Sequence, residues 1–390
     1  MSCPLVKIGD VCSLMTGGTP KTTISEYYED GTVPWIVSGD IHKGEIFDCD
    51  KKITELAVEN SNARYLPKDS VLIALNGQGK TRGTVALLRA SNATCNQSIV
   101  SINPNNQREL FSDYLFYFLK SQYRQIRNIT GDKDRAGLNM PLIRSITIPL
   151  PPLEEQKRIA AILDKADAIR RKRQQAIQLA DDFLRSVFLD MFGDPVTNPK
   201  GWEVKKLDEV GVLDRGKSKH RPRNDPKLLG GEHPLIQTGD VAKSGGYITS
   251  YSATYSDFGL AQSRKWKAGT LCITIAANIA KTGILTFEAC FPDSVVGFKP
   301  NQLVTTEYVQ TWLSFLQKIL EANAPESAQK NINLAILRDL DIPLPPIEQQ
   351  IRFTNTVEKI NELKRKLNNS SKLNKDGFNS LSQKAFAGEL

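Results

Sequence analysis

The sequence predicts a mixed α/β (α+β) protein in which two similar globular domains are separated by two long helices that pack together as a coiled coil. The chain has 390 residues, which is more than one hydrophobic core usually holds. Its two halves repeat each other, which indicates a duplicated domain. Each copy is followed by apolar residues at alternating steps of three and four, the spacing of a coiled-coil seam.

The repeat is clearest around a Pro-Leu-Pro-Pro motif. Residues 148–158 read Ile-Pro-Leu-Pro-Pro-Leu-Glu-Glu-Gln-Lys-Arg, and residues 342–352 read Ile-Pro-Leu-Pro-Pro-Ile-Glu-Gln-Gln-Ile-Arg. Two further pairs of segments align more weakly upstream: 138–144 with 332–338, and 33–41 with 233–241. The offset between the copies changes along the chain, so we expect insertions or deletions in the loops. We interpret the chain as a tandem duplication.

Four regions follow from this repeat. We expect globular domains at 1–152 and 194–346, a central helix at 153–193 and a C-terminal helix at 347–390. Proline fixes φ and has no amide hydrogen, so each Pro-Leu-Pro-Pro segment suits the start of a helix. Residues 192–202 are rich in glycine, proline and asparagine, which predicts a turn between the first helix and the second domain.

Each globular domain is predicted to contain both strands and helices. Apolar runs at 70–75, 84–88 and 271–276 are typical of buried strands. Residues 114–126 and 308–320 carry apolar residues at helical spacing, so we expect amphipathic helices there.

Both long helices are predicted to carry a seam of apolar residues. The members in the central helix, where Arg173 interrupts the seam, are Ile159, Ile162, Ala166, Ile169, Ala176, Ala180, Phe183 and Val187. The members in the C-terminal helix are Phe353, Val357, Ile360, Leu367, Phe378 and Leu381. A helix over 153–191 would extend about 58 Å at 1.5 Å per residue and cannot bury such a stripe alone. We therefore expect the two helices to pack on each other, and docking of each helix on its own globular domain is the alternative.

Composition excludes several classes of protein. With 40% hydrophobic and 24% charged residues the chain is typical of a globular protein. Its apolar runs are shorter than the roughly 18 residues that span a bilayer, and it does not begin with a secretory signal. We expect a cytoplasmic protein with no membrane partner. Six cysteines without a C-x-x-C pair and only three histidines predict reduced thiols and no metal site.

No motif predicts catalysis. Residues 74–81 end in Gly-Lys-Thr like a phosphate-binding loop, but β-type residues follow where such a loop needs a helix, so we expect a turn between two strands. Residues 203–205, Glu-Val-Lys, follow Asp194 as in some magnesium-dependent nucleases, but this tripeptide is common by chance. An Asn- or Asp-Pro-Pro-aromatic signature, expected of an amino-methyltransferase acting on DNA bases, does not occur. These observations favour a binding role with no catalytic residue.

Local clusters of positive charge predict contacts with nucleic acid. The net charge of +8 is compatible with a polyanionic partner but decides little by itself. Residues 215–223, Arg-Gly-Lys-Ser-Lys-His-Arg-Pro-Arg, form a loop suited to phosphate contact, while the equivalent residues 16–23 are much less basic. For each cation outside 215–223, an ordinary solvated surface charge is an equal alternative. The predicted DNA-binding residues are Lys21, Lys80, Arg82, Lys133, Arg135, Arg215, Lys217, Lys219, His220, Arg221, Arg223, Lys243 and Lys281.

The arrangement of these motifs resembles the specificity subunit of type I restriction-modification systems. The resemblance rests on the two Pro-Leu-Pro-Pro-x-Glu-x-Gln helix starts and on the Met-Phe-Gly-Asp-Pro turn at 191–195 that leads to Gly201-Trp202. It covers essentially the whole chain. The segment before the second helix start, residues 329–334, also fits, whereas the first half differs at 136–139.

The resemblance implies a DNA-binding subunit that performs no chemistry itself. Each globular domain would be a target recognition domain that reads one half of a split double-stranded DNA site. The two helices would form an antiparallel spacer that docks DNA adenine methyltransferase subunits, and the two halves would be related by a pseudo-two-fold axis. No cofactor is expected in this chain, because S-adenosylmethionine, ATP and Mg would belong to the methyltransferase and restriction/translocase subunits. A diverged DNA nuclease or methyltransferase with its own activity is the alternative, and a scaffold that binds only proteins is a third hypothesis.

Overall fold

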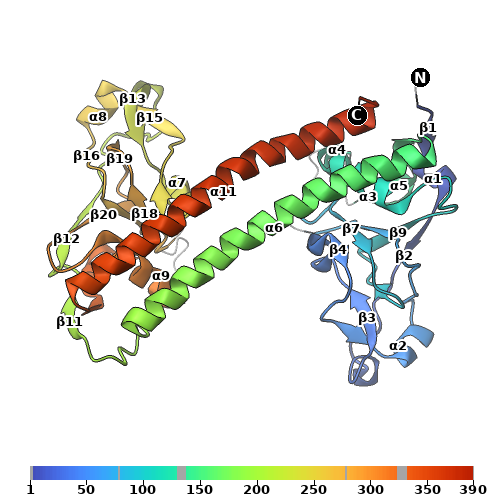
Figure 1. The fold of residues 1–390 in the computed structure, drawn as a ribbon, viewed down its shortest axis with the longest axis horizontal. Helices are drawn as coiled ribbons and strands as arrows, with labels where there is room; N and C mark the ends of the chain where they lie inside the picture. The colour runs from blue at the N-terminus through green and yellow to red at the C-terminus, as the bar shows by residue number, and fades with distance from the viewer. Residues whose placement is uncertain (1–2, 78–79, 130–137, 277–278, 323–331, 390) are drawn as a thin grey trace. The chain divides into compact units, whose positions relative to one another are not determined.

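The computed structural model describes residues 3–77, 80–129, 138–276, 279–322 and 332–389 (Figure 1). By its internal contacts the chain forms two compact units. The first unit consists of Met1–Gln174 with Asn369–Leu390, and the second consists of Gln175–Asn368. Both boundaries fall inside the two long helices, α6 (Leu153–Phe192) and α11 (Ile347–Ala387). Each unit therefore contains one globular part and a piece of both helices.

The first unit is built around a five-stranded sheet. Its strand order is β2 (Cys12–Thr16), β9 (Ile99–Pro104), β6 (Val71–Ala74), β7 (Val85–Leu88) and β4 (Glu45–Ile46). A second sheet contains β5 (Lys52–Ile53), β3 (Val33–Ile36) and β8 (Thr94–Cys95), and β1 (Leu5–Lys7) pairs with β10 (Thr147–Pro149). The helices are α1 (Ile8–Val11), α2 (Glu55–Glu59), α3 (Ser112–Ser121), α4 (Tyr123–Asn128) and α5 (Met140–Ser145).

The second unit repeats this topology with one additional strand, Lys265–Trp266, in its accompanying sheet. Its five-stranded sheet has the order β12 (Gly211–Arg215), β20 (Val295–Pro300), β17 (Leu271–Thr274), β18 (Thr282–Leu285) and β14 (Tyr247–Ile248). The accompanying sheet contains β15 (Ala253–Tyr255), β13 (Leu229–Leu235), β19 (Ala289–Cys290) and β16 (Lys265–Trp266), and β11 (Glu203–Lys206) pairs with β21 (Asp341–Leu344). The helices of its globular part are α7 (Thr238–Lys243), α8 (Asp257–Ala261), α9 (Thr306–Ala322) and α10 (Leu334–Arg338). The predicted duplication of a mixed α/β domain is confirmed.

The repeated Pro-Leu-Pro-Pro motif anchors each long helix to its globular part. Gln156 is fully buried, and its side-chain amide forms three hydrogen bonds with backbone groups, two before α3 and one at Pro151. Gln350 is also fully buried and forms the same three bonds, two before α9 and one at Pro345. Because a buried amide without partners is costly, these bonds fix where each helix starts.

The two long helices contact each other in antiparallel orientation. In the second unit, the ring of Phe353 near the start of α11 lies 5.5 Å from the rings of both Phe188 and Phe192 at the end of α6. Further along the same pair, Lys364 of α11 contacts Asp181 of α6. In the first unit, Leu163 of α6 shares the hydrophobic core with Ala385 of α11. The predicted helix pairing is therefore present within each unit.

The seam predicted for α11 lies on the buried face of that helix. Phe353 and Val357 are buried, and Ile360, Leu367, Phe378 and Leu381 are half-buried.

The seam predicted for α6 requires a correction at two positions. Ile169 is 48% exposed and Phe183 is 51% exposed, so the structure does not bury the seam there. The buried apolar residues of α6 instead include Leu163, Phe188 and Phe192, which lie outside the predicted seam. The remaining predicted members are buried (Ile159, Ala180) or half-buried (Ile162, Ala166, Ala176, Val187).

The reason for this difference is that the ends of α6 face the globular cores as well as the other helix. Leu163 packs in the core of the first unit, and Phe188 stacks on Tyr308 of α9 with ring centroids 5.5 Å apart. A helix that packs on two neighbours buries a wider face than a coiled-coil seam does. At its ends, α6 therefore packs both on α11 and on a globular part.

Candidate nucleic-acid interface

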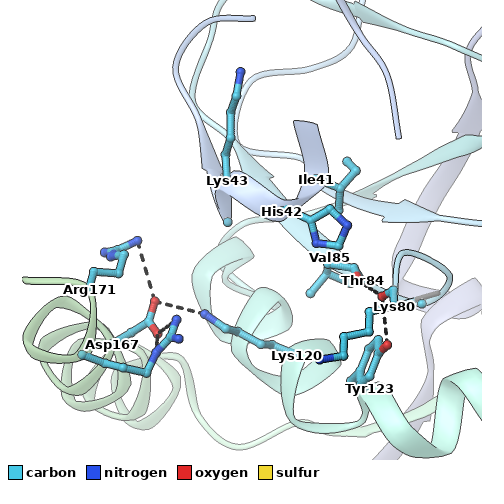
Figure 2. Close-up of a pocket in the computed structure, with 13 residues that line it drawn as sticks. Ile41, His42, Lys43, Lys80, Thr84, Val85, Lys120, Tyr123, Asp167 and Arg171 are labelled. Carbon is cyan, nitrogen blue, oxygen red and sulfur yellow. Dashed lines mark hydrogen bonds and ion pairs between the residues drawn. The ribbon is translucent and has the colours of Figure 1, made fainter. Parts of the chain in front are cut away.

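A pocket of about 430 Å³ in the first unit gathers positive charge (Figure 2). Its walls come from the short 3₁₀ helix Asp40–Lys43, the turn between β6 and β7, the junction of α3 with α4, and α6. Five cationic side chains line it with one carboxylate, that of Asp167. We call this site the basic pocket, and its cationic residues are Lys43, Lys80, Lys120, Arg170 and Arg171.

Asp167 organises the wall that α6 contributes to the basic pocket. Its side chain is only 2% exposed and contacts Lys120 at 3.0 Å, Arg170 at 2.9 Å and Arg171 at 3.7 Å. Burial alone would raise the pKa of Asp167, but the neighbouring cations, first Lys120, outweigh that effect and lower the pKa. One ionised carboxylate is therefore shared by three cations.

The ammonium group of Lys120 is held in place by several neighbours. Besides the contact with Asp167, its Nζ lies 5.0 Å from the ring centroid of Phe116 and 5.6 Å from that of Tyr117. Burial lowers the pKa of Lys120, and the attraction of Asp167 only partly opposes this shift. The side chain is thus a preorganised cation at the pocket wall.

Lys80 lies on the side of the basic pocket opposite to Asp167 and Arg171 of α6 (Figure 2). Its backbone carbonyl accepts hydrogen bonds from the hydroxyls of Tyr123 (2.9 Å) and Thr84 (2.8 Å), which fix this part of the turn. Within the described part of the chain, its side chain forms no ion pair. Lys80 therefore offers the pocket an unpaired positive charge.

The turn that carries Lys80 connects two antiparallel strands, β6 and β7, as predicted. No helix follows the Gly-Lys-Thr sequence, so the geometry of a phosphate-binding loop is not present. The strand registers also align the turns of the two copies. The carbonyl of Thr84 accepts from Ala74 N–H, and that of Lys281 accepts from Thr274 N–H, so Lys281 corresponds to Thr84 rather than to Lys80.

The basic loop of the second unit, residues 215–223, begins at Arg215, the last residue of β12. A Cβ on Gly216 would lie 2.2 Å from the carbonyl oxygen of Phe291, so only glycine fits there. The same close approach occurs in the first unit, where a Cβ on Gly17 would lie 1.8 Å from the carbonyl oxygen of Cys95. The basic loop and residues 16–23 are thus equivalent loops that carry different side chains.

Part of the charge on the basic loop is neutralised within the unit. Arg223 lies 2.6 Å from Asp293 and Arg221 lies 3.6 Å from the same carboxylate. His220 is half-buried and its Nε2 lies 2.9 Å from Asp225. Arg215, Lys217 and Lys219 are exposed, and among the residues that the structure describes they form no ion pair.

A smaller pocket of about 280 Å³ lies beside the basic loop. Its lining combines apolar residues with polar ones, among them Ser218, Arg223, Asn224 and Gln237. The hydroxyl of Ser218 is buried without a hydrogen-bond partner within the described chain. This arrangement suits a polar ligand group, such as the edge of a base or a phosphate.

The remaining predicted DNA contacts are dispersed within their units. Lys21 and Lys243 are exposed and line neither pocket. Arg82 is half-buried and donates to the carbonyl of Arg127, and Lys281 donates to Gln317 at 3.3 Å. Two further predicted contacts, Lys133 and Arg135, lie outside the described residues.

Sequence reasoning missed most of the basic pocket. Lys43, Lys120 and the adjacent pair Arg170–Arg171 come from three separate places in the chain, and only folding brings them beside Lys80. A signal existed in α6, where the run 170–173 reads Arg-Arg-Lys-Arg. Such a run is also typical of a solvated helix face, so it did not identify a site by itself.

The residues considered for a nuclease take part in local structure. Asp194 accepts hydrogen bonds from the backbone N–H groups of Val196 (2.8 Å) and Thr197 (3.0 Å), which closes the turn after α6. The side chain of Glu203 on β11 is 70% exposed and lies 3.6 Å from Lys205. No group of three or more potential ligands for a metal ion was found in the described part of the chain.

All six cysteines are free, and all except Cys3 are buried. Burial raises the pKa of Cys12 and of Cys95 to about 12, which disfavours the reactive thiolate. None of the described helices combines the length and the apolar character needed to cross a membrane.

Comparisons with known proteins match both halves of the chain to one family. The family described as "Type I restriction modification DNA specificity domain" matches residues 4–179 and 199–374. The type I restriction enzyme MjaIX specificity subunit of Methanocaldococcus jannaschii is 29% identical over 61% of this chain and 57% of its own length, so the chain spans about half the length of this relative. The type I restriction enzyme EcoKI specificity subunit of Escherichia coli K12 is 21% identical over 99% of this chain and 89% of its own length.

A solved structure shares the fold. The crystal structure of a type I restriction-modification system S subunit from M. genitalium aligns with a TM-score of 0.63 and 14% sequence identity, over 99% of this chain and 96% of that one. At this identity the likeness concerns the fold alone. The two family matches fall on the two repeats that the sequence and the strand orders define. The chain therefore belongs to the type I restriction-modification DNA specificity family, and it contains two copies of the specificity domain.

Proposed function

We propose that this chain is the DNA-recognition subunit of a type I restriction-modification complex and that each globular part reads one half of a split double-stranded target. The observation that carries this proposal is the repeat itself, because the two parts share one strand order but differ in their equivalent loops. Phosphate contacts position a protein on DNA, and side chains that reach base edges specify the sequence. Two similar folds with different loops suit two different half-sites.

The exposed cations of the basic loop support a DNA partner. Arg215, Lys217 and Lys219 project from a loop that glycine holds close to the sheet. Such cations release counterions when they meet phosphates, so affinity falls steeply as salt rises. Affinity that does not depend on salt would favour a scaffold that binds proteins only.

We infer that the chemistry of the complex belongs to partner subunits. A methyltransferase subunit would supply S-adenosylmethionine, and a restriction/translocase subunit would supply ATP and Mg. The chain itself would be non-catalytic and cytoplasmic, as expected for the recognition subunit of this family. Full-length chain alone, assayed with DNA, Mg and S-adenosylmethionine, should neither cleave nor methylate. Activity without partners would favour the alternative of a diverged nuclease or methyltransferase.

The helices α6 and α11 are proposed to set the gap between the two half-sites and to dock the methyltransferase subunits. Inserting four residues into each helix adds about 6 Å of rise, which corresponds to about two base pairs at 3.4 Å each. The unread gap of the target should lengthen accordingly. An unchanged gap would contradict the spacer role but leave the DNA-recognition role intact.

The experiment that tests the proposed function is to map methylated bases. Cells that carry the full-length chain with its methyltransferase partner should methylate a motif of two separate parts with a fixed gap. Cells that carry the partner alone should not methylate this motif. A continuous motif, or methylation that does not depend on this chain, would overturn the proposal.

A further inference from the structure

The basic pocket of the first unit carries positive charge that its neighbours only partly neutralise. Lys80 forms no ion pair within the described chain, and Lys120, Arg170 and Arg171 share the carboxylate of Asp167. Other carboxylates reach the edges of the site, where Asp40 contacts Lys43, and Glu45 and Asp164 contact Arg171. An anion that enters between Lys80 and Arg170 would complete the charge balance.

The donors of the basic pocket come from several directions (Figure 2). Lys80 lies on the β6–β7 turn, Lys120 at the end of α3 and Arg170 on α6, while His42 adds a ring nitrogen that contacts Thr81 at 3.1 Å. Phosphate oxygens accept hydrogen bonds from several sides, and arginine and lysine are their usual protein partners. At about 430 Å³ the site has the size of a small-ligand pocket, enough for a phosphate and its attached sugar.

In the second unit, the cation at the position equivalent to Arg170 is buried within the unit. The alignment of the two helix starts places Lys364 of α11 opposite Arg170 of α6. Lys364 is 9% exposed, and its ammonium group contacts Asp181 at 2.5 Å and the carbonyl of Gly245 at 3.4 Å. Both helix cations contact a carboxylate, but the side chain of Arg170 is 45% exposed and that of Lys364 is 11% exposed. Arg170 therefore remains accessible to an anion, whereas Lys364 is enclosed within the second unit.

We propose that the basic pocket binds one phosphate of the DNA backbone, held by Lys80, Lys120 and Arg170. This inference rests on the proposed DNA-recognition function and adds a contact made by the long helix α6 itself. The pocket positions the duplex beside the first recognition domain and reads no base. The asymmetry between the two units gives this domain a phosphate contact that its repeat lacks at the equivalent helix position.

The test measures DNA binding by the full-length chain as a function of salt. A fluorescent duplex of about 30 base pairs and mixed sequence is titrated, because phosphate contact does not require a specific target. The variant Lys80→Gln with Arg170→Gln removes two pocket cations. The control, Lys165→Gln with Lys172→Gln, removes two exposed cations of α6 that lie outside the pocket. Thermal unfolding verifies that both variants fold, and Lys80→Gln alone replaces the double variant if it does not.

The pocket variant should bind about tenfold more weakly at low salt, and its slope of log affinity against log salt should fall by about 0.9, the value for one lost phosphate contact. The control should keep the wild-type slope. Equal slopes for the pocket variant, control and wild type would overturn this inference alone. Wild-type protein without salt-dependent DNA binding would overturn the proposed function as well.

A second arm distinguishes DNA phosphate from a free phosphate compound. Binding of inorganic phosphate is measured by calorimetry for wild type and for the pocket variant. Loss of inorganic phosphate binding together with the lowered DNA slope supports the proposal. Loss of inorganic phosphate binding with an unchanged DNA slope would assign the pocket to a free anion and overturn the proposal.

Discussion

The two units share a fold but hold their positive charge in different places. In the first unit the cations line a pocket between the β6–β7 turn and α6, while the loop at 16–23 carries only Lys21. In the second unit the cations crowd the equivalent loop, 215–223, and the helix cation Lys364 is bound by Asp181. The two units thus share the elements that build the domain and differ in their charged surfaces.

The largest expected effect tests what the two units have in common. Gln156→Ala and Gln350→Ala each leave backbone groups without hydrogen-bond partners in a buried position, so each should lower the free energy of unfolding by about 3 kcal/mol. Urea denaturation measures both. Glu154→Ala, whose side chain is 84% exposed, is the control and should cost less than about 0.5 kcal/mol.

Clearly unequal losses of unfolding free energy for Gln156→Ala and Gln350→Ala would contradict the equivalence of the two anchors.

The next effect concerns the first unit alone. Asp167→Asn removes the ionised carboxylate that three cations share, and we expect a loss of about 2 kcal/mol at neutral pH. The folded state lowers the pKa of Asp167, so this stabilisation is present above the ordinary aspartate pKa of about 4 and is lost as pH falls through the lower folded value. Denaturation at a series of pH values measures it. A difference between wild type and variant that grows toward acid pH would contradict this account.

The matching ion pair in the second unit should contribute less. Asp181 is 48% exposed, so solvent screens its contact with Lys364, and Asp181→Asn should cost about 1 kcal/mol. The same denaturation series at neutral pH compares it with Asp167→Asn. A cost larger than that of Asp167→Asn would reverse the expected order of the two units.

The smallest expected effect is a change in DNA affinity at the basic loop of the second unit. Asp293→Asn frees Arg221 and Arg223 from their shared carboxylate, so affinity for DNA of mixed sequence should rise about threefold at low salt. Asp257→Asn removes a fully exposed carboxylate from the same unit and serves as the control, with no change expected. Anisotropy titrations measure both. Unchanged affinity for Asp293→Asn would show that these arginines do not face DNA.

The sequence predicted the architecture well because the repeat exposed it twice. The strands β6, β7 and β17 and the helices α3 and α9 lie where apolar patterns placed them, and both long helices begin at the proline motif. The exposure of Ile169 and Phe183 was not predictable, because a heptad pattern does not say whether a helix end also packs on a globular core.

The candidate site was predicted only in part. The loop 215–223 is a continuous run of cations, so the sequence reveals it directly. The basic pocket joins Lys43, Lys80, Lys120 and Arg170, whose proximity depends on how the sheet packs on α3 and α6. The shared Lys-Thr sequence would align Lys80 with Lys281, but the strand register pairs Lys281 with Thr84 because fewer residues separate the two strands in the second copy.

The most direct test of the central claim, that each globular part reads its own half-site, is to exchange one part for the other. Residues 1–152 are replaced by a second copy of residues 194–346, and the methylated motif of the complex with its methyltransferase partner is mapped. We predict two identical half-sites in inverted orientation. Persistence of the two original half-sites would contradict the claim.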